Sequence, residues 1–344
     1  MTATDERPAP VDRSAAVETV DLPLPVVGSL SPSRAADFTT CPLLYKLRAV
    51  DRLPERPSPA AARGTVVHAV LERLFDLPAA GRTPQAARSL VAGAWADLVL
   101  AQPELAELAP ADDPAAVDRW LDEVGELLSG YFELEDPRRL EPAAREQLVE
   151  VVLDGGLQLR GYVDRLDEAP TGELRVVDYK TGRVPGERFE AKALFQMKFY
   201  ALVLWRARGV VPTELRLVYV GERDMLRYRP DEAELAAFER KLRALWAAID
   251  RATATGDWRA RPSRLCEWCA HRRTYCTAWP VDDAAKADYD AWRAGYELAR
   301  AERAEQAERA EQAGQAASDG ARRPLRAART RGLVAADAVV RPVG

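Results

Sequence analysis

The 344-residue sequence lacks any run of about 18 apolar residues, the length that a membrane-spanning helix needs. Its N-terminus carries Asp5 and Glu6 and no apolar segment, so we expect no secretory signal, a cytoplasmic location and no membrane partner. An excess of positive charge is also missing, because Lys and Arg number 49 against 54 for Asp and Glu, a net charge of -5. This balance argues against a basic nucleic-acid coat but allows an enzyme with a local basic groove.

Cysteine is scarce, with four residues in the whole chain: Cys41, Cys266, Cys269 and Cys276. Three of them form a C-x2-C-x6-C cluster, which in a cytoplasmic protein indicates metal ligation rather than disulfides. Iron–sulfur clusters are held by four cysteine thiolates. Zinc is the alternative, with His271 able to replace one cysteine, and buried free thiols are the simplest alternative. Cys41 can join the other three only if the two ends of the chain meet.

The N-terminal region shows no strand pattern. Residues 1–28 are rich in Pro, Ala and mixed charge without periodicity, and we expect them to form a disordered arm. Ser31 followed by Pro32 indicates the start of a helix. Apolar residues at helical spacing predict that this helix continues past Cys41 to Leu47.

A Pro-rich connection over residues 54–59 precedes a second expected helix that begins near Arg63. His68 and Glu72 lie one turn apart on an edge of its apolar stripe. A helical histidine of this kind is more often a core residue than a metal ligand, and an exposed glutamate is common. Residues 84–132 again have helical spacing, and we expect a helical subdomain inserted before the sheet.

The central region alternates like half-buried strands separated by glycine-containing turns. The pattern predicts strands over 148–153, 157–168, 173–180, 214–220 and 224–229, and helices over 191–207 and 231–253.

The C-terminal region, residues 283–344, differs in composition. Residues 285–313 predict an Ala/Glu/Arg-rich helix in which the segment 302–307 repeats at 308–313. A six-residue period builds no lasting apolar stripe, so we expect a solvated helix. The tail beyond Gly314, with its arginines, is expected to be disordered.

Two carboxylates and a lysine lie near the ends of two neighbouring strands. A hairpin would bring Asp164 beside Asp178, and Lys180 shares a strand face with Asp178 because it lies two residues on. Carboxylate oxygens are ligands that magnesium and manganese prefer. Exposed aspartates at strand ends are also common, but both aspartates here are flanked by apolar residues. The stretch therefore predicts a metal site for phosphodiester hydrolysis.

Four local patterns occur in a fixed order along the chain: Gly64-x-x-x-His68, Gly161-Tyr162-Val163-Asp164, Asp178-Tyr179-Lys180 and Gln196-x-x-x-Tyr200. Together they resemble the RecB-type exonuclease family of the PD-(D/E)XK nuclease superfamily, over about residues 30–280. The early cysteine and the three late cysteines are similar to those of AddB-type and CRISPR-adaptation nucleases.

This resemblance implies an α/β fold with a restriction-endonuclease-like core, in which helices flank a mixed central sheet, spanning residues 29–282 with the helical insertion at 84–132. It implies a Mg or Mn site formed by His68, Asp164 and Asp178. The position of Glu72, one turn after His68, makes it a candidate to support this site or an ordinary exposed glutamate. Lys180, Gln196 and Tyr200 would serve catalysis, and the four cysteines would hold a [4Fe–4S] cluster. Arg183, Lys192 and Lys198 lie near enough in sequence to contact phosphates.

The implied activity is metal-dependent DNA exonuclease action on single strands or ends, in repair, recombination or CRISPR-type processing. The chain has no G-x-x-x-x-G-K-[ST] motif, so any helicase would be a separate partner. Two other functions are open: a catalytically inactive DNA-binding or scaffold protein of the same fold, and an iron–sulfur redox sensor.

Overall fold

The computed structural model describes residues 28–108, 113, 115–184, 186 and 190–321. Nearly all of the expected N-terminal arm and the arginine-rich part of the tail lie outside these residues. The chain divides into two compact units, residues 1–286 and 287–344. The second unit is described by a single helix, α9 (Asp283–Ala321), which begins in the first unit and extends beyond the predicted end at residue 313.

Six strands form one mixed sheet in the order β1-β3-β4-β5-β6, with β2 also paired to β3. The β1–β3 and β4–β5 pairs are parallel and the others are antiparallel. The strands are β1 (Ser29–Leu30), β2 (Ala144–Val152), β3 (Gln158–Glu168), β4 (Leu174–Lys180), β5 (Glu214–Tyr219) and β6 (Asp224–Tyr228). The five longer strands match the predicted ones to within a few residues, whereas β1 was not predicted.

Strand β3 has a gap along one of its edges. Strand β2 covers the other edge from Gln158 to Leu166. On the gapped edge, β1 pairs only at Gln158 and Leu159, and β4 pairs only from Arg165 to Glu168. Residues 160–164 therefore have no strand partner on that edge within the described part of the chain, and we call this segment the β3 notch. Asp164 is its last residue.

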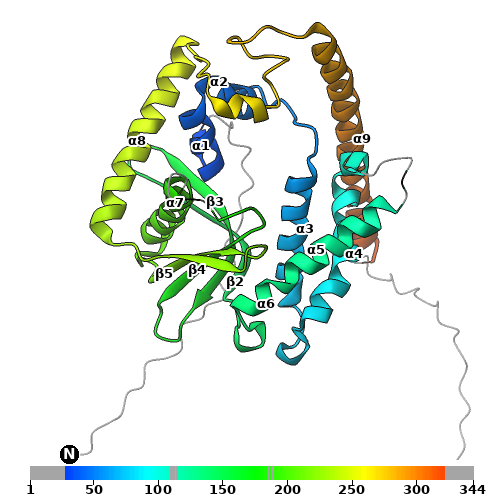
Figure 1. The fold of residues 1–344 in the computed structure, drawn as a ribbon, viewed down its shortest axis with the longest axis vertical. Coiled ribbons are helices and arrows are strands. Elements are labelled where there is room, and N and C mark those ends of the chain that lie inside the picture. Colours follow the sequence, from blue (N-terminus) through cyan, green and yellow to red (C-terminus); the bar gives the residue numbers. More distant parts are fainter. Residues whose placement is uncertain (1–27, 109–112, 114, 185, 187–189, 322–344) are drawn as a thin grey trace, which may run out of the picture. The chain divides into compact units, whose positions relative to one another are not determined.

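Helices cover both faces of the sheet (Figure 1). One face packs against α1 (Pro32–Thr40), α7 (Glu190–Arg208) and α8 (Glu232–Thr255). The other packs against α3 (Pro59–Leu74), α4 (Pro84–Ala101), α5 (Ala116–Ser129) and α6 (Tyr131–Leu134). The alternation of a strand places Val176 in the first apolar cluster and Val177 in the second. The predicted α/β class with a mixed sheet flanked by helices is confirmed.

The first helix is shorter than predicted. It begins as expected, with the Ser31 side chain accepting a hydrogen bond from the Arg34 N–H, but it ends at Thr40. Cys41 is extended (φ -160°), and a short helix, α2 (Pro42–Tyr45), and a π-helical turn (Lys46–Val50) follow. Pro42 explains the break, because it disfavours the helical conformation of the residue before it. The single helix predicted to continue to Leu47 is therefore wrong.

Helix α3 begins at Pro59, four residues before the predicted start, where the Ser58 side chain accepts a hydrogen bond from the Ala61 N–H. Proline suits the first turn of a helix because no backbone donor is needed there. Within the described ranges, none of the helices combines the length and the apolar character that crossing a membrane requires.

Candidate active site

Asp164 and Asp178 come together where the β3–β4 ladder ends. The pairing between the two strands stops at Arg165 and Val177, and the aspartates are the next residue of each strand toward the gap. Both are buried, with 8% and 4% of their surfaces exposed. Asp164 accepts a hydrogen bond from the Tyr179 N–H through Oδ2 at 2.6 Å. The hairpin that the sequence predicts is present, and it gathers two buried carboxylates.

The Asp178 carboxylate has a partner on each of its oxygens. Lys180 Nζ lies 2.5 Å from Oδ2, and the Gln196 amide donates to Oδ1 at 2.8 Å. Burial and the nearby charge of Asp164 raise the pKa of Asp178, while the Lys180 cation opposes this rise. Two carboxylates buried side by side repel each other, so an additional cation between them would be favourable.

His68 from α3 reaches the same cluster. Its Nδ1 lies 3.4 Å from Asp164 Oδ2 and 3.7 Å from Glu146 Oε1, and its Nε2 lies 2.9 Å from the Tyr179 carbonyl oxygen. Burial disfavours the imidazolium, but the contacts with Asp164 and Glu146 outweigh it and raise the pKa of His68 to about 10. Without a metal, the protonated ring thus supplies positive charge to the cluster.

Glu146 belongs to this cluster and was missed by the sequence analysis. One ligand atom each from His68, Glu146 and Asp164 lie within 4.8 Å of one another, the spacing that one metal ion requires. The predicted strand began at Leu148, so Glu146 fell in a polar segment without a signal. Its backbone is left-handed (φ 43°), which is strained for a residue with a side chain. Such strain is common where a side chain is held for function.

Glu72, the expected supporting carboxylate, lines a cavity of about 450 Å³ together with His68 and Glu146. Burial and the charge of Glu146 raise the pKa of Glu72. Glu72 is not one of the three residues whose ligand atoms cluster, which are His68, Glu146 and Asp164.

Gln196 and Tyr200 lie one turn apart on α7, and the Gln196 amide donates to the Tyr200 hydroxyl at 3.3 Å. Gly161 in the β3 notch is needed for this arrangement, because a Cβ there would lie 2.8 Å from Tyr200 Cε1. That distance is well below the roughly 3.5–4.0 Å of an ordinary carbon contact. The glycine of the G-x-x-D pattern therefore makes room for the tyrosine of the Q-x-x-x-Y pattern.

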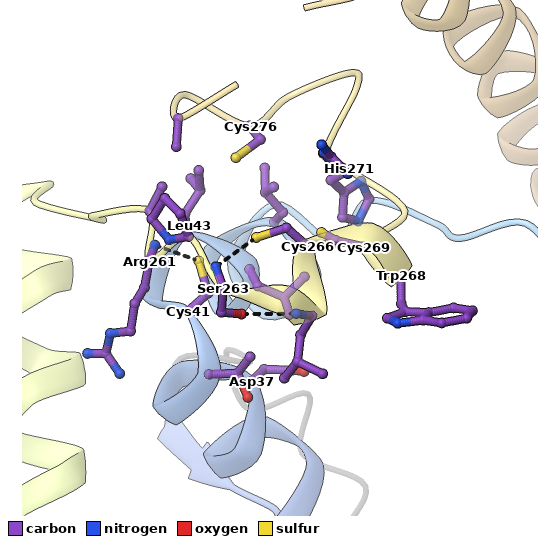
Figure 2. A pocket seen from close by; sticks show the side chains of 18 of the residues that line it. Asp37, Cys41, Leu43, Arg261, Ser263, Cys266, Trp268, Cys269, His271 and Cys276 are labelled. Atoms are coloured by element: carbon purple, nitrogen blue, oxygen red, sulfur yellow. Dashed lines mark hydrogen bonds between the residues drawn. The ribbon is translucent and has the colours of Figure 1, made fainter. Parts of the chain in front are cut away.

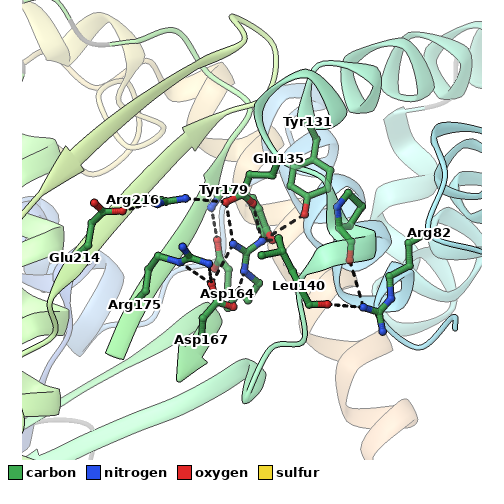
Figure 3. A network of polar contacts seen from close by, with 12 residues as sticks. Arg82, Tyr131, Glu135, Leu140, Asp164, Asp167, Arg175, Tyr179, Glu214 and Arg216 are labelled. Carbon is green, nitrogen blue, oxygen red and sulfur yellow. Dashed lines mark hydrogen bonds and ion pairs between the residues drawn. The ribbon is translucent and has the colours of Figure 1, made fainter. Parts of the chain in front are cut away.

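Arg165, a buried arginine next to Asp164, links the strands to the helical side. Figure 3 labels its partners Glu135, Asp167 and Tyr179. The Arg165 guanidinium donates to Glu135 at 2.8 and 3.0 Å and to the Tyr179 hydroxyl at 2.8 Å. Its Nε lies 3.1 Å from Asp167 Oδ1. Tyr179 in turn contacts Asp164 and His68 through its backbone. The sequence signal for this role is weak, because arginine is frequent in the chain.

The four cysteines line one cavity of about 280 Å³ (Figure 2), and neither Asp164 nor Asp178 is among its lining residues. Cys41 comes from the N-terminal helices and the others from the segment after α8, so the two ends of the domain do meet. Cys41 Sγ accepts a hydrogen bond from the Arg261 N–H, and Cys266 Sγ from the Ser263 N–H, both at 3.3 Å. No three of the sulfurs lie within 4.8 Å of one another in the described residues.

The three expected DNA-contacting residues lie in the loop after β4 and on α7. Arg183 is exposed in the loop after β4. Lys198 on α7 pairs with Glu234 on α8 at 2.6 Å. Lys192 lies in α7, but its side chain is outside what the structure describes.

The cluster combines hard oxygen donors, an imidazole and a lysine cation at the gapped edge of a mixed sheet. Oxygen and imidazole donors suit divalent ions such as magnesium and manganese, and a fixed cation can stabilise charge on a phosphate. The fold and this cluster together define a nuclease.

Comparison with known families identifies which one. The profile of the PD-(D/E)XK nuclease superfamily matches residues 29–277, and the chain belongs to that superfamily. The gene 69 protein of Mycobacterium phage D29 is 30% identical over 196 residues, covering 52% of this chain and 70% of the phage protein.

Two solved structures are also similar, at low identity. A candidate exonuclease from Eubacterium rectale is 13% identical with a TM-score of 0.47, covering 74% of this chain and 91% of its own. The protein SSO0001 is 14% identical with a TM-score of 0.34; the match covers 74% of this chain and 88% of the SSO0001 chain.

Proposed function

We propose that this nuclease is a RecB-type, metal-dependent DNA exonuclease that acts on single strands or DNA ends. The observation that carries the proposal is the convergence of His68, Glu146, Asp164 and Asp178 with Lys180 at the β3 notch. These residues come from three strands and a helix, so only the folded chain assembles them. A repair, recombination or CRISPR-type role and a separate helicase partner belong to the same proposal.

The donor set fits a divalent magnesium or manganese ion. His68, Glu146 and Asp164 already point ligand atoms at a common centre, and the buried Asp178 carboxylate adds negative charge beside it. A bound ion would polarise the phosphodiester and lower the pKa of water. The imidazole favours manganese over magnesium. The His68 proton must leave when an ion binds, so binding is coupled to proton release.

The residues of the chain then have distinct tasks. Lys180 would position the attacking water and offset the charge that develops on the phosphate. Asp178 holds Lys180 through its 2.5 Å contact, and Gln196 orients Asp178 with its amide. Tyr200 fixes Gln196 from the next turn of α7.

The test is digestion of a single-stranded oligonucleotide, labelled in separate samples at its 5′ or 3′ end, with and without manganese. We expect stepwise, manganese-dependent products from the wild type, and a loss of at least about 100-fold for Asp178→Asn, the cost of removing one charge-positioning group. Asp154→Asn is the matched control, because Asp154 is exposed in the β2–β3 turn. Cleavage within the strand would contradict the exonuclease assignment.

The alternative is a scaffold that binds DNA without cutting it. In that case the wild type and Asp178→Asn would both be inactive and would bind the oligonucleotide equally well. An intact set of Asp164, Asp178 and Lys180 favours the enzyme.

We also propose that Cys41, Cys266, Cys269 and Cys276 hold a [4Fe–4S] cluster that connects the start of the nuclease domain, residues 29–282, to its end. The support for this proposal is that all four cysteines line one cavity of about 280 Å³, although Cys41 is far from the other three in the sequence. The backbone hydrogen bonds to Cys41 and Cys266 would stabilise ligating thiolates.

Metal analysis and visible absorption of the purified protein test this centre. We expect iron and a brown colour in the wild type, and loss of both together with lower stability in Cys269→Ser. One zinc per chain would favour the zinc alternative. If the wild type contains no metal and Cys269→Ser is as stable as the wild type, both the iron–sulfur and the zinc assignments are contradicted. Reversible bleaching coupled to DNA affinity would instead indicate a redox sensor.

A further inference from the structure

A second cavity opens beside the carboxylates, at the other end of the β3 notch. It has a volume of about 450 Å³ and lies between the start of α1, the notch and α7. Helices α1 and α7 and strand β3 lie side by side there (Figure 1). Gln196 lines this cavity and also donates to Asp178. Gln196 therefore connects the wall of this cavity to the catalytic cluster.

Two arginines give this cavity positive charge. Arg160 and Arg34 both line it, and their charges are close enough to oppose each other. Arg34 is held in place by hydrogen bonds from its Nη1 to the Ser29 carbonyl and hydroxyl oxygens, at 3.1 and 2.8 Å. The backbone of Arg160 pairs with β2, but its side chain has neither a hydrogen bond nor an ion pair with the described residues. Two neighbouring cations are stabilised by an anion bound between them.

An exposed aromatic ring accompanies the arginines. Tyr162 lines the same cavity and exposes 55% of its surface, an unusual exposure for a large ring. It lies two residues after Arg160, so both side chains extend from the same face of β3. An aromatic ring beside a cationic groove is the common arrangement for binding a single strand, because any base can stack on the ring.

We propose that this cavity binds the nucleotide next to the scissile phosphate: Arg160 and Arg34 contact its phosphate and Tyr162 stacks on its base. The proposal rests on the proposed nuclease function, because it assumes a DNA strand that crosses the catalytic cluster. It gives the notch a purpose, since a strand partner at residues 160–164 would close the edge where the cavity lies.

The experiment compares two substrates that differ in whether they reach the cavity. One is a single-stranded oligonucleotide; the other is methyl p-nitrophenyl phosphate, a phosphodiester without a nucleotide. Arg160→Gln is expected to lower kcat/KM for the oligonucleotide about tenfold relative to that for the small ester. Tyr162→Ala is expected to lower the same ratio of kcat/KM values because stacking is lost. Tyr162→Phe keeps an aromatic ring and should retain the wild-type ratio.

Oligonucleotide affinity is measured in parallel by fluorescence anisotropy without a divalent ion. Arg160→Gln should weaken binding about tenfold and reduce the salt slope by about 0.7, the value for one phosphate contact on a single strand. Arg160→Lys should retain most of the affinity because it keeps the charge. Arg240→Gln is the matched control, since Arg240 is an exposed arginine on α8 that does not line the cavity.

The outcomes separate the two proposals. If the wild type cleaves neither substrate, the nuclease proposal fails, while the anisotropy still decides whether the cavity binds DNA. If Arg160→Gln and Arg240→Gln have the same affinity and the same substrate ratio, the cavity proposal is overturned. An equal loss on both substrates would also overturn it, because the defect would then lie in the catalytic cluster.

Discussion

Removing the Arg165 side chain tests how the helical side of the domain supports the site. Arg165 exposes 1% of its side chain and bridges Glu135, Asp167 and the Tyr179 hydroxyl. Replacement by methionine would keep most of the volume and remove the charge. Among the described residues, Glu135, with 5% of its side chain exposed, would then have Arg216 as its remaining ion-pair partner, at 3.3 Å.

The cost follows from the burial of the partners. Breaking a buried ion pair by removing one partner costs about 3–5 kcal/mol, because the other charge is left without compensation. For a domain of this size, each kcal/mol lowers Tm by about 2–4 °C, so we expect a drop of about 6–20 °C. Tyr179 would lose its hydrogen bond to Arg165, which would loosen the part of β4 whose backbone contacts Asp164 and His68. Manganese affinity should therefore fall by about 10- to 100-fold.

Urea unfolding and calorimetric manganese titration measure the two effects. Arg175→Met is the control, because Arg175 contacts the same Asp167 at 2.7 Å but has 29% of its side chain exposed. It should cost at most about 1 kcal/mol. Adding Glu135→Gln to Arg165→Met should recover part of the loss. The reasoning is refuted if Arg165→Met and Arg175→Met are equally stable and bind manganese equally well.

Three further predictions concern single positions. Gly161→Ala places a Cβ 2.8 Å from Tyr200 Cε1. Steady-state kinetics should show a cleavage rate at least tenfold lower, while the free energy of unfolding falls by only about 1–3 kcal/mol. An unchanged cleavage rate would contradict the close approach of Gly161 and Tyr200. Glu146→Gln should weaken manganese binding by about 10- to 100-fold in a calorimetric titration, and unchanged affinity would remove Glu146 from the site. Burial disfavours the charged form of Glu55, but its hydrogen bonds to His271 and Arg48 outweigh this effect and lower its pKa from 4.5 to about 2. The stability advantage of the wild type over Glu55→Gln should therefore be full above pH 4.5 and disappear as the pH falls to 2; a pH-independent difference in urea unfolding would contradict it.

Local patterns in the sequence predict the hairpin of β3 and β4 well. Alternating apolar residues and a glycine turn specify two adjacent strands, and their register follows from the short connection, so Asp164 and Asp178 end up together. The Ser31 cap is predictable for the same reason, since it depends only on residues three positions away.

The parts that were missed depend on distant or irregular structure. Glu146 has a left-handed backbone within strand β2, and no neighbouring residue in the sequence signals this conformation. The partners of Arg165 lie 30 residues upstream, at Glu135, and 14 residues downstream, at Tyr179. The break at Cys41 did have a local signal in Pro42, but the apolar spacing on both sides masked it.

The most direct test of the catalytic cluster measures manganese binding and DNA cleavage on the same two variants. Asp178→Asn should lose both, because it removes a charge from the metal site and releases Lys180. Lys180→Met should still bind manganese, yet cleave a single-stranded oligonucleotide at least about 100-fold more slowly than the wild type. Cleavage at the wild-type rate by either variant would contradict the assignment of this cluster as the active site.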